Sequence, residues 1–113
     1  MPISIRDDPA LSRYELVEGD GVIGELTYRL HDGRIALLHL GVDAERRGEG
    51  HAARLATFAL DDARTRGLAV LPYCPYVHAF IQRHQAAYAD LVAPTQRAAF
   101  GLPSADGTSP ASP

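Results

Sequence analysis

The chain has 113 residues, a formal net charge of −3 and one cysteine, and all eleven of its Lys or Arg residues are arginine. This length suits one domain, the charge gives no overall attraction to nucleic acid or to an anionic membrane, and no apolar run approaches the roughly 20 residues that span a bilayer. A lone cysteine excludes an internal disulfide, and no secretory signal precedes Arg13, so we expect a cytoplasmic protein.

The first half of the chain is predicted to be an antiparallel meander. Apolar and polar residues alternate in segments 13–18 and 22–30, and segment 35–42 is almost continuously apolar, which predicts a strand buried on both faces. The turn signals Gly19–Gly21 and Asp32-Gly33 separate these three strands. Residues 1–9 are expected to pair loosely or to fray.

In the second half, the spacing of the apolar residues changes to three and four, which predicts a helix that Gly67 ends. Its apolar stripe consists of Ala52, Leu55, Ala56, Ala59, Leu60 and Ala63. A short buried strand at 68–71 follows, and this strand–helix–strand order predicts a crossover between parallel strands. A last helix is expected from about Pro75 to Leu91. The predicted class is therefore α+β.

The chain is expected to form one domain over residues 1–100. Residues 101–113 contain Gly, Pro, Ser, Thr, Ala and Asp with one leucine. This composition cannot bury a core, so we predict a disordered tail.

A glycine-containing turn joins the third strand to the first helix, from Val42 to Ala52. Gly48 and Gly50 allow close approach of the backbone, and the first N–H groups of a helix are unsatisfied and partly positive. Together with Arg46 and Arg47, they can hold an anion such as a pyrophosphate. The alternative is a flexible turn that only starts the helix. The turn lacks the Gly-Lys-Ser/Thr of a P-loop and the third glycine of the dinucleotide fingerprint.

The segment Arg47-Gly48-Glu49-Gly50-His51-Ala52 resembles the Arg/Gln-x-x-Gly-x-Gly/Ala signature of the GCN5-related N-acetyltransferases. The resemblance implies that this turn holds the pyrophosphate of acetyl-coenzyme A (acetyl-CoA). Arg47, Gly48, Gly50 and Ala52 take the signature positions. It also implies a minimal form of that family's fold, in which the two parallel strands splay apart.

Further motifs resemble a small subfamily of short acetyltransferase-like domains, the YjdJ-like or NATD1-like group. The motifs are His39, Cys74-Pro75-Tyr76-Val77, Arg83-His84, Tyr88 and Leu91-Val92. The match covers residues 14–92. The subfamily has His-Thr-Glu-Val where this chain has His39-Leu40-Gly41-Val42, so a carboxylate is missing at Gly41. The stretch from His84 to Tyr88 is also one residue longer than in the subfamily.

Cys74 and His39 are the candidate catalytic residues. Pro75 is favoured at the first position of a helix, which makes Cys74 the N-cap, where the helix dipole favours a thiolate that could accept an acetyl group. The alternative is a small buried hydrophobe. His39 could take a proton from an incoming ammonium, or it could be hydrogen-bonded in the core.

The cofactor-binding residues are expected to gather at the glycine turn and at the start of the last helix, where Tyr73 and Tyr76 could shape the acceptor entrance. The expected set is Val42, Arg46, Arg47, Gly48, Glu49, Gly50, His51, Ala52, Tyr73, Cys74 and Tyr76. A metal site built from Cys74, His78 and a second histidine has only one thiolate, which argues against structural zinc.

The sequence thus predicts an acetyl-CoA-dependent N-acetyltransferase that acts on an unidentified amine of a protein or a small molecule, with Cys74 as a candidate acyl acceptor. A coenzyme A or acyl-CoA binding module without turnover is the alternative, and a domain whose strand edge captures a peptide is the third hypothesis.

Overall fold

The computed structural model of the protein describes residues 2–102, which form one five-stranded sheet with helices. The strands lie side by side in chain order: β1 (Ile3–Asp8), β2 (Arg13–Glu18), β3 (Gly21–His31), β4 (Arg34–Val42) and β5 (Ala69–Pro72). The first four pair antiparallel, and β5 pairs parallel with β4. The predicted α+β class, with a meander followed by a crossover, is confirmed.

The turns of the meander follow the predicted chemistry. Asp32 and Gly33 both have positive φ, 49° and 74°, as a two-residue hairpin turn requires. The expectation of loose pairing near the N-terminus was too weak. All six residues of β1 pair with β2 in register. Ile3 and Ile5 pack against the core, and this burial offsets the conformational entropy that the strand loses when it becomes ordered.

A β-bulge interrupts the pairing of β3 with β4. Tyr28 lies opposite Leu37, but its neighbour Thr27 lies opposite His39, so Leu38 is an extra residue on β4. Because side chains alternate between the faces of a strand, the extra residue reverses which face each later residue of β4 presents.

Helix α1 (His51–Arg66) carries the predicted apolar stripe, whose five residues from Leu55 to Ala63 are buried, and Gly67 ends it with a φ of 68°. The prediction of one continuous last helix was wrong. The chain forms α2 (Pro75–Arg83), leaves helical geometry at His84 (φ −124°, ψ 44°) and continues in short turns. These turns are α3 (Gln85–Tyr88), η2 (Ala89–Leu91), α4 (Pro94–Arg97) and η3 (Ala98–Phe100), while η1 (Ala44–Arg46) lies before α1.

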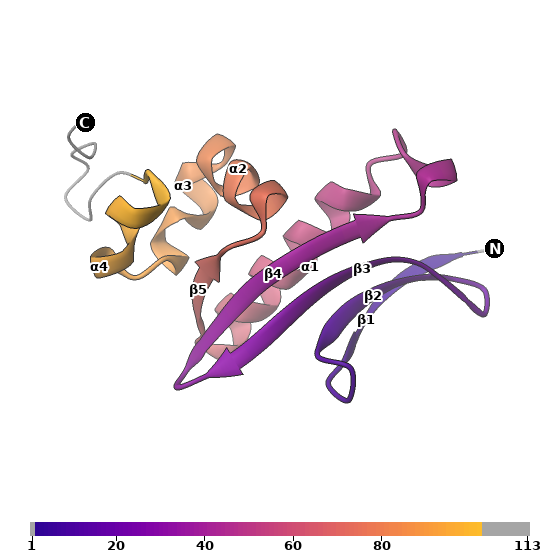
Figure 1. Ribbon diagram of the computed structural model, residues 1–113, viewed down its shortest axis with the longest axis horizontal. Coiled ribbons are helices and arrows are strands. Elements are labelled where there is room, and N and C mark those ends of the chain that lie inside the picture. Colours follow the sequence, from indigo (N-terminus) through magenta and orange to yellow (C-terminus); the bar gives the residue numbers. More distant parts are fainter. Residues whose placement is uncertain (1, 103–113) are drawn as a thin grey trace.

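The helices leave one face of the sheet uncovered. Figure 1 shows β4 and β3 in front of α1, while α2 to α4 lie beyond the β5 end of the sheet. Leu26, Tyr28 and Leu37 point to the helix side and are buried, whereas His39 is exposed and Leu38 is 36% exposed. The expectation that this strand is buried on both faces was therefore wrong, because no helix among residues 2–102 packs on the second face.

The folded part extends further toward the C-terminus than predicted. Leu102 is fully buried and belongs to the hydrophobic core, and Gly101 turns the chain with a φ of 66°. The first two residues of the predicted tail are thus part of the domain, and 103–113 lie outside the described residues. Within the described chain, no helix is long and apolar enough to cross a membrane.

Candidate functional site

A cavity of about 240 Å³ lies at the glycine turn between β4 and α1. The structure brings together eight of the eleven predicted cofactor-binding residues around it, together with Ala53, which was not predicted. The lining residues are Val42, Arg46, Arg47, Gly48, Gly50, His51, Ala52, Ala53 and Tyr76. Its wall therefore joins the C-terminal end of β4, the first turn of α1 and the first turn of α2.

The backbone of the turn requires glycine at two positions. Gly48 and Gly50 have φ values of 83° and 81°, in the left-handed region that other residues enter at a cost. A Cβ added at either residue would meet nothing within 4 Å, so the space beside both is open. Gly50 is the N-cap of α1 and has no side chain that could satisfy the first helical N–H groups. This end of the helix can therefore offer its donors to an anion.

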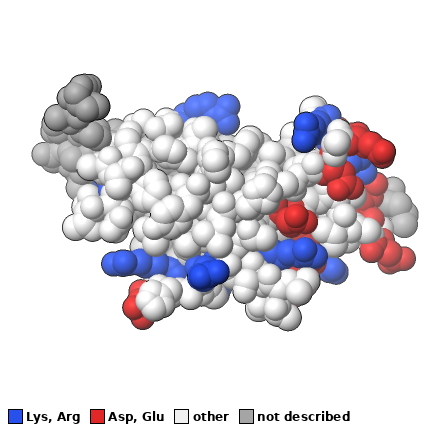
Figure 2. All heavy atoms as spheres, in the orientation of Figure 1, with Lys and Arg blue, Asp and Glu red and all other residues white. Residues whose placement is uncertain are grey.

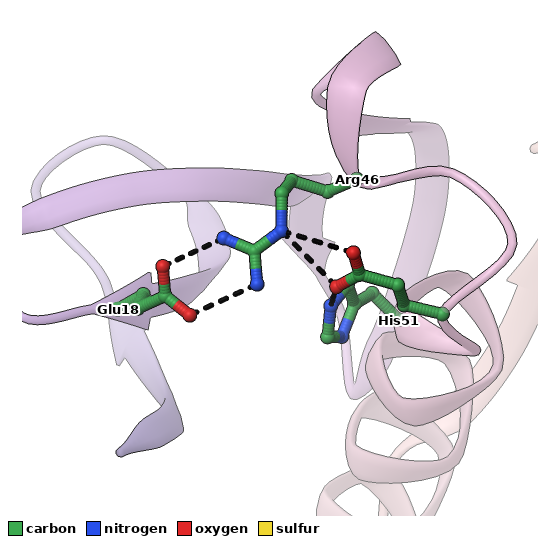
Figure 3. A network of polar contacts seen from close by, with 4 residues as sticks. Glu18, Arg46 and His51 are labelled. Atoms are coloured by element: carbon green, nitrogen blue, oxygen red, sulfur yellow. Dashed lines mark hydrogen bonds and ion pairs between the residues drawn. The ribbon is translucent and has the colours of Figure 1, made fainter. Parts of the chain in front are cut away.

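Arg46 is held by two carboxylates at the edge of this cavity (Figure 3). Its NH1 and NH2 groups donate to Glu18 at 2.6 and 2.9 Å, and its Nε donates to Glu49 at 3.0 Å. These hydrogen bonds raise the pKa of Arg46, with Glu18 as the larger cause, and lower the pKa of Glu18. The pKa of Glu49 is lowered first by its contact with His51 and then by Arg46. The positive charge predicted to face a phosphate is thus already neutralised, and Glu18 was not anticipated because it lies on β2.

His51 has a buried nitrogen with no partner. The side chain is 4% exposed, and its Nε2 lies 2.7 Å from a Glu49 oxygen. Its Nδ1 has no hydrogen bond within the described residues. An unsatisfied buried polar atom costs free energy, and this one belongs to a residue that lines the cavity.

The predicted residues around α2 lie in different environments. Cys74 is the N-cap of α2 as predicted, but its side chain is 2% exposed and lies in the hydrophobic core, as in the alternative interpretation of this residue. Tyr73 is 58% exposed, and its ring contacts Phe100 with centroids 5.5 Å apart. Only Tyr76 of these three lines the glycine-turn cavity.

The two parallel strands separate beyond Leu37. Their pairing ends at Leu37 and Pro72, and the Cys74 N–H then donates to the Leu37 carbonyl at 2.7 Å. From Leu38 to Val42, no strand in the described chain pairs with the β5 side of β4. This open strand edge leads from the pairing end at Leu37 to Val42 in the cavity wall.

His39 lies on the part of β4 that pairs with β3 but not with β5, and it is exposed on the uncovered face of the sheet, so the alternative of a core histidine was wrong. Among the residues of the described chain, no group of three His, Cys, Asp or Glu side chains could hold a metal ion. The arrangement combines a helix start without a side-chain cap, an open strand edge and an exposed imidazole.

Comparisons with known proteins identify a family for the sequence and a similar fold. The sequence model of one family, described as GCN5-related N-acetyl-transferase, matches residues 13–91. The fold is similar to the NMR solution structure of a GCN5-like protein from Staphylococcus aureus, with a TM-score of 0.62 and 22% sequence identity over 80% of this chain and 87% of that one. A comparison with curated proteins found no match.

Proposed function

Because the chain belongs to the GCN5-related N-acetyltransferase family, we propose that it transfers an acetyl group from acetyl-CoA to an amine. The observation that carries this proposal is the cavity at the start of α1. There, two positive-φ glycines leave open space beside unsatisfied backbone N–H groups.

The residues of the turn fit the pyrophosphate of acetyl-CoA. A diphosphate needs several donors, room for close approach of the backbone, and positive charge. The helix start supplies the donors, and Gly48 and Gly50 supply the room. Arg47 is exposed and supplies a positive charge, because it forms no ion pair with a carboxylate of the described chain, unlike Arg46. The unpartnered Nδ1 of His51 adds a buried polar atom beside them.

Acetyl-CoA would supply an activated acyl group as a thioester. The backbone from Gly48 to Ala52 would bind its phosphates, and the open edge of β4 from Leu38 to Val42 would offer peptide groups to its amide-containing arm. These residues would thereby direct the acyl group toward the end of the β4–β5 pairing, where His39 and Cys74 lie on the two sides of the split.

The test of this site is a pair of substitutions at Gly50. Gly50→Ala and Gly50→Glu both force a side chain into a left-handed conformation, at a cost of about 1–2 kcal/mol in folding free energy. Only Gly50→Glu also places a carboxylate among the phosphate donors. We expect calorimetry to show acetyl-CoA binding for Gly50→Ala and a loss of at least about 100-fold in affinity for Gly50→Glu. Equal affinity in both variants would refute the assignment of the turn.

Transfer directly from acetyl-CoA to the amine is the route we propose, because the Cys74 thiol is packed in the core. We expect Cys74→Ala to retain kcat within about threefold of the unsubstituted chain, at a cost of about 1 kcal/mol in stability. Acetylation at Cys74 is the competing route. A hydroxylamine-labile mass gain on Cys74, together with loss of turnover in Cys74→Ala, would establish it instead.

A coenzyme A binding module without turnover is the second candidate. It is favoured by Gly41, which brings no side chain to the open part of β4. Binding of acetyl-CoA by calorimetry, with no amine-dependent release of free thiol, would select the module over the enzyme.

A further inference from the structure

A carboxylate from the neighbouring strand occupies the space above Gly41. The bulge places Glu25 of β3 directly opposite Gly41, and Thr27 directly opposite His39. A methyl group built at Gly41 would lie 3.5 Å from Nε2 of His39 and 3.7 Å from Oε1 of Glu25. The imidazole and the carboxylate therefore face one small space on the uncovered face of the sheet.

The Glu25 carboxylate has unused capacity for a cation. Its neighbour Arg13 directs Nε and NH2 to Glu15 at 2.8 and 2.7 Å, and only its NH1 approaches Glu25, at 3.9 Å. Glu15 is buried and also accepts from Arg6, so the two arginines neutralise that carboxylate first. Within residues 2–102, Glu25 accepts no hydrogen bond, and its side chain is 37% exposed.

The uncovered face can admit an amine. Figure 1 shows no helix in front of β3 and β4. In the same orientation, Figure 2 shows more charged side chains over the strands than over α3 and α4. His39 is the second residue after the last β4–β5 pair, so the Glu25–His39 space adjoins the start of the open edge of β4.

We infer that Glu25 is the ammonium-binding residue and general base of the acetyl transfer, with His39 beside it, so that the acceptor is a primary amine presented to the uncovered face of the sheet. This inference rests on the proposed function. A carboxylate that accepts no hydrogen bond from residues 2–102 can bind the ammonium, and it can also take one of its protons.

The proton and bond changes balance on these groups. An ammonium has three protons on nitrogen, and the secondary amide product keeps one. The first proton passes to Glu25 and leaves to solvent by way of exposed His39. The nitrogen lone pair then forms the N–C bond with the acetyl carbon, and the C–S bond breaks with its electron pair on sulfur. The second proton passes from nitrogen to that thiolate, which becomes the free thiol.

The test compares Glu25→Gln with Asp20→Asn, which removes an exposed carboxylate from the β2–β3 turn. The acceptors are a blocked lysine peptide, a peptide with a free N-terminus and spermidine. At neutral pH we expect kcat/KM for the amine to fall about 100-fold in Glu25→Gln and to remain unchanged in Asp20→Asn. The loss should shrink at higher pH, where the amine is already deprotonated. The charged or titratable groups around Glu25 are Arg13, Arg6, Glu15 and His39. Calorimetry should give the same acetyl-CoA affinity for all three proteins.

A readout without turnover is amine binding by NMR in the presence of coenzyme A. Shifts at Glu25, Thr27 and His39 should appear in the full chain and be lost in Glu25→Gln. Restoring a carboxylate on the adjacent strand, in Glu25→Gln/Gly41→Glu, should recover at least about tenfold of the lost kcat/KM.

The role of Glu25 would be overturned if kcat/KM and the amine affinity of Glu25→Gln were both within threefold of the unsubstituted chain. The proposed function would then still stand. Glu25-dependent amine binding with no transfer by any variant would instead refute the proposed function and retain the ammonium site. Absence of both from the unsubstituted chain would overturn the two together.

Discussion

Arg46 and Arg47 are adjacent in sequence but have different roles in the turn. Arg46 forms hydrogen bonds with Glu18 of β2 and with Glu49 of the turn, so Arg46 holds the turn against the sheet. Glu49 also contacts His51. Arg47 lines the same cavity, is exposed, and forms no ion pair with the rest of the described chain. The sequence alone predicted both as phosphate contacts, because the acidic partner of Arg46 on β2 is 28 residues away.

At this scale we expect Arg47→Gln and Arg46→Gln to have separable effects. Arg47→Gln should weaken acetyl-CoA binding by about three- to tenfold, with less weakening at high salt, and leave Tm unchanged, because it removes a screened surface charge. Arg46→Gln should lower Tm as well, because it leaves Glu18 and Glu49 without their common partner. Calorimetry at two salt concentrations and thermal unfolding distinguish the two outcomes. An unchanged Tm in Arg46→Gln would contradict the structural role.

Two tyrosine hydroxyls connect elements that are far apart in the chain. Tyr14 of β2 donates to Asp62 of α1 at 2.7 Å, and Tyr28 of β3 donates to Asp7 of β1 at 2.6 Å. Their rings also touch, with centroids 5.0 Å apart. Burial, and then the bond to the nearby carboxylate, raises the pKa of each hydroxyl far above its usual value. These contacts connect α1 to the N-terminal half of the sheet.

A raised pKa in the folded state stabilises the protein below the unfolded value near pH 10, and this contribution is lost as pH rises above it. We therefore expect the free energy of unfolding to fall steeply above about pH 10. Tyr14→Phe should lower it by about 1 kcal/mol at neutral pH and make the alkaline decrease shallower. Urea unfolding at several pH values measures both effects. Tyr73→Phe, on an exposed ring, is the control, and an equal alkaline slope in Tyr14→Phe would contradict the assignment.

The strands and α1 could be predicted from the sequence because each has a local signal. The hairpin at Asp32-Gly33, the stripe of α1 and the stop at Gly67 all depend on residues close in sequence. The bulge at Leu38 has no such signal. With regular pairing from that hairpin, Glu25 would lie opposite Leu40, and the imidazole would point to the core.

The same distinction applies to the candidate site. The turn residues were predicted because they lie close together in the sequence, and seven of them line one cavity. Glu18 was missed because its ion pair with Arg46 joins residues 28 positions apart. Glu25 was missed because only the pairing of β3 with β4 places it opposite Gly41. The break at His84 was missed because its apolar spacing continues the helical pattern of α2, while the backbone leaves it.

The C-terminal segment closes the core of the whole molecule. After α2 the chain passes through short turns and returns to the core with Leu102, which is fully buried. The Leu102 N–H donates to the Arg97 carbonyl at 2.9 Å, and the Arg97 side chain donates to the Val92 carbonyl at 3.0 Å. One apolar residue thus secures the last turns against the rest of the domain.

We expect Leu102→Ala to lower the free energy of unfolding by about 2–4 kcal/mol, because it leaves a cavity in the core. The matched control is Leu11→Ala, since Leu11 is 57% exposed and its loss should change stability by less than about 0.5 kcal/mol. Urea unfolding of the full chain gives both values. Equal effects of the two substitutions would show that the last turns are not part of the cooperative unit.

The extra residue at Leu38 also affects how such chains are compared with one another. Aligned column by column, a chain with glycine at position 41 shows the loss of an acid from this strand. On the uncovered face of the sheet, however, a carboxylate is present, because Glu25 of the adjacent strand reaches the same space. Two homologous chains could therefore supply the same carboxylate from neighbouring strands. A comparison of one strand alone would then classify an active chain as lacking its acid.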